Sequence, residues 1–167
     1  MKQIWRYLME GKHYSPETLK NILQRYYDLP SMISAEFQAA HEAAKTLSAG
    51  LSPEVQQYVG EELREHMRCA GMLATQNRFL HDALFRLNPM EQEIVKYRLM
   101  GPKDPERRRK GFRLAPWKVI AQLVGISDSQ ARNIMQQSMK RLSELPVEPV
   151  TFESSGDFGA PKKEELS

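Results

Sequence analysis

The chain has 167 residues, and its 24 lysine and arginine side chains against 21 aspartate and glutamate give a formal charge of +3. A chain of this length forms one domain or one and a half, and it buries enough surface on folding to need neither a disulfide nor a metal. With 41% apolar and 27% charged residues, the composition is globular and excludes a fully disordered chain.

Nothing in the sequence predicts a membrane span or a signal peptide. A spanning helix needs about 18 or more consecutive apolar residues, and the apolar runs here are much shorter. Charges at Lys2, Arg6 and Glu10 interrupt the first residues before an apolar signal core can form. The single cysteine, Cys69, excludes an intrachain disulfide and fits a reducing compartment. We therefore expect a cytoplasmic protein.

The apolar pattern predicts an all-α protein, because apolar residues recur every three or four positions and no segment alternates as a strand does. A first short helix is expected from Ile4 to Met9. The next helix has Ser15 as its N-cap and Pro16 in its first turn. Pro30 then predicts a break or kink near Leu29, since an interior proline removes a hydrogen bond.

Ser52 and Pro53 open a long helix that the periodicity carries to about Leu87. Its apolar seam is spaced like that of a coiled coil and has to be covered by another helix. The simplest cover is the preceding helix folded back as an antiparallel hairpin, and the alternative is a second copy, giving a homodimer through the N-terminal helices. Asn77 lies on this seam, and we favour a partly exposed position for it over a role in fixing the oligomeric state.

Residues 87–142 carry the most specific signals in the chain. Asn88 can cap a helix that starts at Pro89, and Glu91 completes a capping box. This helix is expected to end before Gly101.

Two further helices joined by a turn are predicted over residues 117–142. Gly125 lies at the turn, where a left-handed backbone is usually needed, and Ser127 with Gln130 forms a second capping box. The apolar positions agree with the packing of a helix-turn-helix, and they are Ile120, Ala121, Val124, Ile126, Ala131 and Ile134. A helical corner in a protein that never meets DNA is the alternative interpretation.

In a helix-turn-helix the second helix lies in the major groove of DNA, and its outward-facing N-terminal residues contact base edges. Arg132 can pair with guanine, and Asn133 or Gln136 with adenine. The predicted base contacts are Ser129, Arg132, Asn133 and Gln136.

A basic loop over residues 103–118 supports this interpretation, because seven cations there face only Asp104 and Glu106. Clustered cations beside a recognition helix displace counterions from DNA phosphates. The predicted phosphate contacts are Arg107, Arg108, Arg109, Lys110, Arg113, Lys118 and Lys140. A solvated surface loop is the alternative, and Lys140 can instead compensate the dipole of its helix.

Other candidate sites are weak. His66, Cys69 and His81, with Glu62 one turn before His66, do not supply the four ligands at recognisable spacing that structural zinc needs. Cys69 lies in a helical stripe, and we interpret it as a small buried side chain rather than a nucleophile. No phosphate-binding glycine loop is present. The sequence therefore predicts no metal, no cofactor and no enzymatic activity.

The expected organisation has three parts. Residues 1–86 form an N-terminal helical hairpin for interaction or oligomerisation, and residues 87–145 form a helix-turn-helix DNA-binding domain. Residues 146–167 are rich in proline, glycine and serine, with acids outnumbering two lysines, and predict a disordered acidic tail.

Residues 87–98, LNPMEQEIVKYR, resemble the opening helix of region four of bacterial sigma factors of the sigma-seventy type. In that helix a leucine, a capping turn and a glutamate precede an apolar run that ends near an arginine. Residues 117–142 are similar to the helix-turn-helix of the same region, through Trp117 to Ala121, Gly125 to Ser127, and Arg132, Ile134 and Leu142. The resemblance covers about a third of the chain and implies promoter recognition and contact with RNA polymerase.

Two departures refine the resemblance. Residues 101–116 form a long basic insertion where sigma region four usually has a short link, and residues 1–86 do not look like the aromatic-rich region that melts promoters. A small sigma-like protein with a helical N-terminal half is closer to phage-encoded transcription regulators of the ArpU and RinA kind.

The sequence thus favours a sequence-specific DNA-binding transcription regulator, phage or prophage encoded, that acts with bacterial RNA polymerase. A second hypothesis is a DNA-packaging adaptor like a phage small terminase, although such proteins usually have the DNA-binding part first. A third is an interaction module that binds polymerase without touching DNA, which the basic loop argues against.

Overall fold

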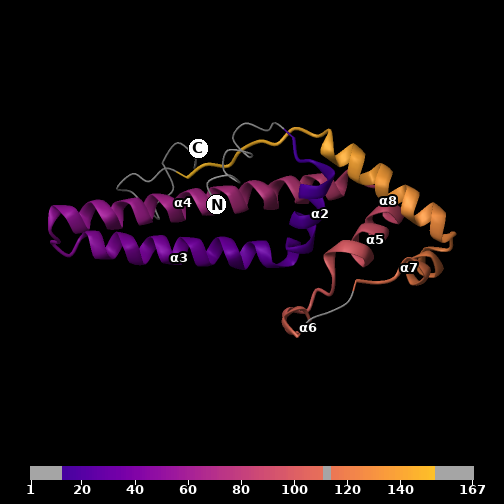
Figure 1. Ribbon diagram of the computed structural model, residues 1–167, viewed down its shortest axis with the longest axis horizontal. Helices are drawn as coiled ribbons and strands as arrows, with labels where there is room; N and C mark the ends of the chain where they lie inside the picture. Colours follow the sequence, from indigo (N-terminus) through magenta and orange to yellow (C-terminus); the bar gives the residue numbers. More distant parts are fainter. Residues whose placement is uncertain (1–12, 111–113, 153–167) are drawn as a thin grey trace, which may run out of the picture. The chain divides into compact units, whose positions relative to one another are not determined.

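The computed structural model describes residues 13–110 and 114–152 (Figure 1). All regular secondary structure in these ranges is helical, which confirms the predicted all-α class. None of the helices in the described ranges is long and apolar enough to cross a membrane. The predicted short helix from Ile4 to Met9 lies outside the described residues.

Helices and helical turns follow one another in a simple order. They are α2 (Pro16–Gln24), the 3₁₀ turn η1 (Tyr26–Asp28), α3 (Leu29–Leu47), α4 (Pro53–Phe85), α5 (Pro89–Val95), the π-helical turn η2 (Lys96–Met100), α6 (Pro105–Arg109), α7 (Trp117–Val124) and α8 (Asp128–Ser143).

The chain forms two compact units whose division falls inside α4. The first unit contains residues 13–29 and 75–148, and the second contains residues 30–74 and the segment that starts at Pro149. This division differs from the predicted boundary between residues 86 and 87. The reason is that α2 packs against α8 and η2, which ties the N-terminal segment to the C-terminal half of the sequence.

The predicted cap and start of the helix at Pro16 are confirmed. The Ser15 hydroxyl accepts a hydrogen bond from the Thr18 amide at 3.1 Å, and Pro16 is the first residue of α2. The predicted break near Leu29 takes the form of η1, after which α3 begins. Pro30 is therefore in the first turn of α3, where no intrahelical partner exists for a backbone N–H.

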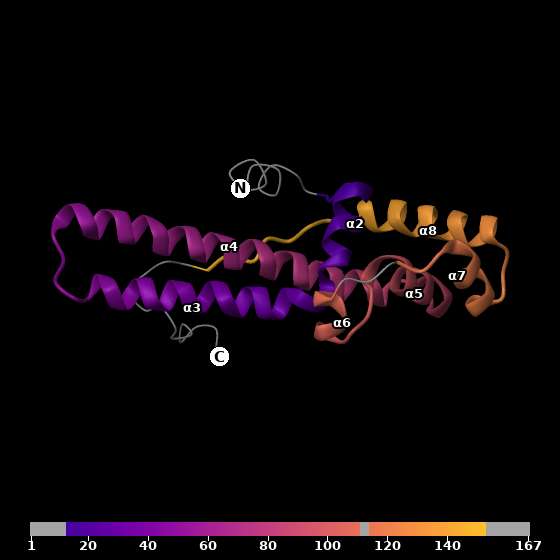
Figure 2. The same ribbon diagram turned by 60° about the horizontal axis from the view of Figure 1, so that its bottom comes forward.

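In the second unit, α3 and the first part of α4 lie side by side and antiparallel, as both views show (Figures 1 and 2). His66 on α4 contacts Glu36 on α3, with 2.7 Å between Nδ1 and Oε2. The buried apolar residues of this unit include Ala40, Ala43, Val59, Met67, Cys69, Ala70, Met72 and Leu73. Two helices cover each other's apolar stripes here, as the hairpin prediction requires.

The C-terminal segment at residues 149–152 packs against the same hairpin. The Phe152 ring meets that of Phe37 edge-on, with 4.9 Å between centroids. A Cβ on Gly71 would lie 2.9 Å from the Val150 carbonyl oxygen, so the backbone of the segment approaches α4 closely at this glycine. The predicted disordered tail therefore does not begin at residue 146, because apolar residues hold the chain beyond it. Residues 153–167 lie outside the described residues.

The first unit is organised around α8, which packs against α2, α5 and α7 (Figure 2). The side chains that pack between these elements form the core of the unit. The buried residues include Leu19, Leu23, Ile94, Val95, Met100, Ile120, Ala131, Met135, Met139 and Leu142. One helix thus carries contacts to most of the unit.

The turn between α7 and α8 confirms the predicted local signals. Gly125 has a φ of 77°, and its amide and that of Ile126 both donate to the Ala121 carbonyl, at 2.9 and 3.0 Å. The Ser127 hydroxyl accepts from the Gln130 amide at 3.2 Å, and the Gln130 side chain accepts from the Ser127 amide at 3.0 Å. A left-handed glycine ends one helix, and a capping box begins the next.

Replacing Gly125 with alanine should lower the free energy of unfolding by about 1–2 kcal/mol, the cost of a left-handed backbone for an ordinary residue. No atom lies within 4 Å of a Cβ at this position, so the effect is backbone strain alone. Gly125→Asn should cost less, since asparagine tolerates this conformation. Gly60→Ala is the control, because its Cβ meets only the tip of Arg64 at 3.8 Å, and it should stabilise the helix. Urea denaturation measures all three, and an unchanged Gly125→Ala variant would contradict the strain.

Candidate nucleic-acid interface

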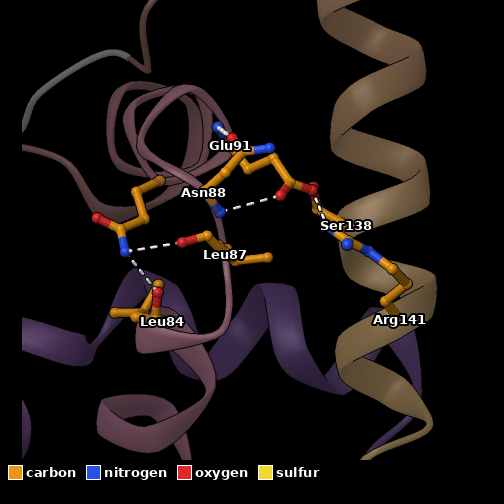
Figure 3. A network of polar contacts seen from close by, with 7 residues as sticks. Leu84, Leu87, Asn88, Glu91, Ser138 and Arg141 are labelled. Carbon is orange, nitrogen blue, oxygen red and sulfur yellow. Dashed lines mark hydrogen bonds and ion pairs between the residues drawn. The ribbon is translucent and has the colours of Figure 1, made fainter.

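The carboxylate of Glu91 joins the start of α5 to α8. Asn88 accepts from the Glu91 amide at 2.8 Å, and Glu91 Oε1 accepts from the Asn88 amide at 3.0 Å, which confirms the predicted capping box. Glu91 Oε2 also accepts hydrogen bonds from the Ser138 hydroxyl, at 2.9 Å, and from the Arg141 guanidinium (Figure 3). One buried carboxylate therefore both takes part in the N-terminal cap of α5 and forms polar contacts with α8.

Gln92 stabilises the link between α4 and α5. Its Nε2 donates to the carbonyl of Leu84 at 2.7 Å and to that of Leu87 at 3.1 Å. These carbonyls lie at the end of α4 and in the short link that follows, where helices leave acceptors without intrahelical partners. The connection from α4 to α5 is therefore held by side-chain hydrogen bonds, as Figure 3 shows.

Truncating Glu91 to alanine should lower the free energy of unfolding by about 2–3 kcal/mol, because it removes a cap and the charge-assisted bonds to α8 together. Glu91→Gln should cost about 1 kcal/mol, since glutamine can complete a capping box but carries no charge. Ser138→Ala is the matched control and removes a single bond, for about 1 kcal/mol. Chemical denaturation gives the three values, and a Glu91→Ala cost no larger than that of Ser138→Ala would refute the double role.

The exposed face of α8 carries the four predicted base contacts. Ser129, Arg132, Asn133 and Gln136 are all exposed, at helical spacings of three, four and seven residues from the first. Lys140 follows at the same spacing and is also exposed. The opposite face is buried, through Ala131, Met135, Ser138, Met139 and Leu142. The structure thus brings the predicted polar set together on one side of a helix whose other side is anchored.

Most of the described cations of the basic loop are exposed. Arg107 on α6, Lys110 after it and Lys118 on α7 lie at the surface of the first unit. Asp104, one of the two acids of the loop, caps α6 by accepting from the Glu106 amide at 3.0 Å. The side chain of Arg109 and the whole of Arg113, both predicted phosphate contacts, lie outside the described residues.

Arg108, also predicted as a phosphate contact, differs from its neighbours because its guanidinium has partners within the protein. Its Nε and Nη2 donate to Asp28 Oδ1 at 3.1 and 2.6 Å. Its Nη1 donates to the carbonyls of Pro102 at 3.0 Å and Lys103 at 2.7 Å, and its guanidinium lies 5.6 Å from the centroid of the Tyr27 ring. With its side chain only 8% exposed, Arg108 fastens the loop to the segment between α2 and α3.

Arg107 and Arg108 form a matched pair for mutation, because they are adjacent and differ in burial. Arg108→Ala should lower the free energy of unfolding by about 2 kcal/mol, since it removes the hydrogen bonds that the buried guanidinium donates to Asp28 and to two backbone carbonyls. Arg107→Ala should change it by no more than about 0.5 kcal/mol, as for other surface substitutions. Urea denaturation of both variants checks the contrast, and equal small effects would contradict a structural role for Arg108.

The ring of Trp117 lies close to two arginine side chains, one on η2 and one on α8. The Arg98 guanidinium lies 4.8 Å and the Arg132 guanidinium 6.0 Å from the centroid of its ring. Arg98 lies on η2 and also donates to the Ala115 carbonyl at 3.0 Å. A π-helical turn contains an extra residue and displaces the side chains that follow from α-helical register, so helical periodicity does not predict this grouping.

Charge is distributed unevenly between the two units. Over its full sequence range, the unit that contains α8 has 19 lysine and arginine residues against 11 acids. The other unit has 5 against 10. The net charge of +3 therefore conceals a basic unit and an acidic one, and the candidate interface belongs to the basic unit.

The weak metal and nucleophile candidates do not form a site in the described residues. Within these ranges, no group of three or more His, Cys, Asp or Glu side chains is placed to hold a metal ion. His66 is engaged with Glu36. Burial raises the pKa of the Cys69 thiol to about 11, with a smaller contribution from Glu36 and Glu65. The thiol is protonated at neutral pH and is a weak nucleophile there.

Comparison of the chain with models of known families, with curated proteins and with solved structures found no match. The function is therefore inferred from the residues and the geometry. Their main features are a polar face on an anchored helix, exposed cations in the same unit, and an aromatic ring next to two guanidinium groups.

Proposed function

We propose that the protein is a sequence-specific DNA-binding transcription regulator in which α7 and α8 form a helix-turn-helix. The observation that carries this proposal is the face of α8 formed by Ser129, Arg132, Asn133 and Gln136, exposed while the opposite face is buried. In this motif the second helix enters the major groove and its outward residues reach base edges. The helix needs a fixed orientation for such readout, and the bonds from Glu91 to Ser138 and Arg141 supply it.

The side chains on this face have the chemistry of base recognition. An arginine donates two parallel hydrogen bonds to guanine, which suits Arg132, and an asparagine or glutamine pairs with adenine in the same two-bond manner. Asn133 and Gln136 therefore complement Arg132 rather than duplicate it. A binding protein of this kind needs no enzymatic activity and no cofactor.

Phosphate contacts are assigned to exposed cations of the same unit. Arg107, Lys110, Lys118 and Lys140 are exposed and belong to the basic unit. Arg109 and Arg113 add charge to the same loop. Such contacts fix the register of a protein on the duplex without reading sequence, and they make affinity fall steeply with salt.

The similarity of residues 87–98 and 117–142 to sigma region four extends the proposal to the partner. We place the protein among phage or prophage regulators that act with bacterial RNA polymerase in the cytoplasm. The acidic unit built from α3 and the first part of α4 then supplies a surface for polymerase or for a second copy of the chain. This surface is separate in sequence from the DNA-reading helix.

Selection from a random DNA library with the full-length protein, at two salt concentrations, tests the proposal. A short enriched motif is expected. On that motif, Arg132→Ala should lose about 1–3 kcal/mol of binding free energy, roughly 5- to 150-fold in affinity. Lys118→Ala should weaken binding to all sequences alike and lower the slope of log affinity against log salt by about 1.

Three results would overturn this assignment. Equal losses on the selected motif and on random DNA for both variants would contradict the separate roles of Arg132 and Lys118. Salt-sensitive binding with no enriched motif would favour a DNA-packaging adaptor, and mass measurement of a ring of subunits would support that function. Binding to polymerase with no DNA affinity at any salt would identify an interaction module.

A further inference from the structure

Trp117 contacts the helix that carries the proposed base contacts at Arg132. The ring belongs to the first residue of α7, and the Arg132 guanidinium on α8 lies 6.0 Å from its centroid. Arg98 approaches the same ring to 4.8 Å. Three elements, η2, α7 and α8, thus meet at one aromatic side chain of the first unit.

The two guanidiniums differ in how firmly they are held. Arg98 is half-buried and donates to the Ala115 carbonyl at 3.0 Å, so its position is fixed independently of the ring. Arg132 is exposed, and its guanidinium lies over the ring of Trp117. The electron-rich face of an indole attracts cations, more strongly than the faces of tyrosine and phenylalanine. Trp117 therefore restricts a long side chain that would otherwise rotate in solvent.

We propose that Trp117 is a positioning residue that orients Arg132 for contact with a guanine base edge. This inference rests on the proposed function and adds a determinant of specificity to it. A two-bond contact from arginine needs the guanidinium plane in one orientation. Holding that orientation before binding lowers the entropy lost on binding. Arg98 supplies a second positive charge at the same place, and the ring reduces the repulsion between the two cations.

A measurement without DNA tests the contact itself. Trp117→Leu, Arg132→Ala and the double variant form a double-mutant cycle on the unfolding equilibrium of the full chain. The ring and the guanidinium should be coupled by about two- to fivefold in the unfolding constant, the range expected for an exposed cation–π pair. Trp117→Phe keeps an aromatic face and should retain part of the coupling. Additive effects of the two substitutions would refute the contact.

The same variants on DNA test the positioning. On a motif selected by the wild-type protein, Trp117→Leu should weaken binding about two- to fivefold, and Trp117→Phe less. Binding to random DNA should be unchanged. In the Arg132→Ala background, Trp117→Leu should have no further effect on the motif. A purely structural role would instead lower affinity equally in both backgrounds and on both kinds of DNA, and that result would overturn the proposal.

Failure of this inference and failure of the proposed function are distinguishable. If the wild-type chain selects no motif, the proposed function fails, and the unfolding cycle still decides whether Trp117 holds Arg132. If a motif is selected and Arg132→Ala loses it while Trp117→Leu does not, the proposed function stands and the positioning role is refuted. Circular dichroism of Trp117→Leu and Trp117→Phe verifies that both variants retain the helical fold.

Discussion

The first unit depends on a single buried carboxylate. Glu91 begins α5 by capping and holds α8 through Ser138 and Arg141, so two helices far apart in sequence are oriented by one group (Figure 3). α8 also packs against α2 and α7, so the same helix contacts most of the other helices of the unit. The proposed DNA-reading face is the outer side of the same helix. Its geometry is therefore a consequence of an interaction on the inner side.

A second constraint acts on the basic loop. Arg108 is bound to Asp28 and to two backbone carbonyls, and this fastens a segment whose other described cations face solvent. Within one short helix, adjacent arginines thus have opposite roles, one internal and one external. The cost of burying Arg108 is offset by its hydrogen bonds, and the loop presents Arg107 and Lys110 from a defined place.

Local features of this fold could be predicted from the sequence, and contacts between distant segments could not. The capping boxes at Asn88 and Ser127 and the left-handed Gly125 follow from residues within one turn of each other, and all are confirmed. The roles of Arg108 and Trp117 depend on partners that only the tertiary fold brings near. The same holds for residues 149–152, whose polar neighbours suggest a tail, whereas Phe152 finds an aromatic partner on α3. The composition of a segment describes its average character, whereas its packing depends on individual side chains such as Phe152.

The first unit is discontinuous, and the 45 residues from Pro30 to Ala74 interrupt it as an insertion. The entropic cost of closing a loop grows only with the logarithm of its length. Hairpins of quite different lengths, or with quite different surfaces, are therefore compatible with the same basic unit. Such a chain can exchange its acidic hairpin during evolution while the network around Glu91 remains intact. Modularity of this kind arises without a linker, because the insertion begins and ends in continuous helices.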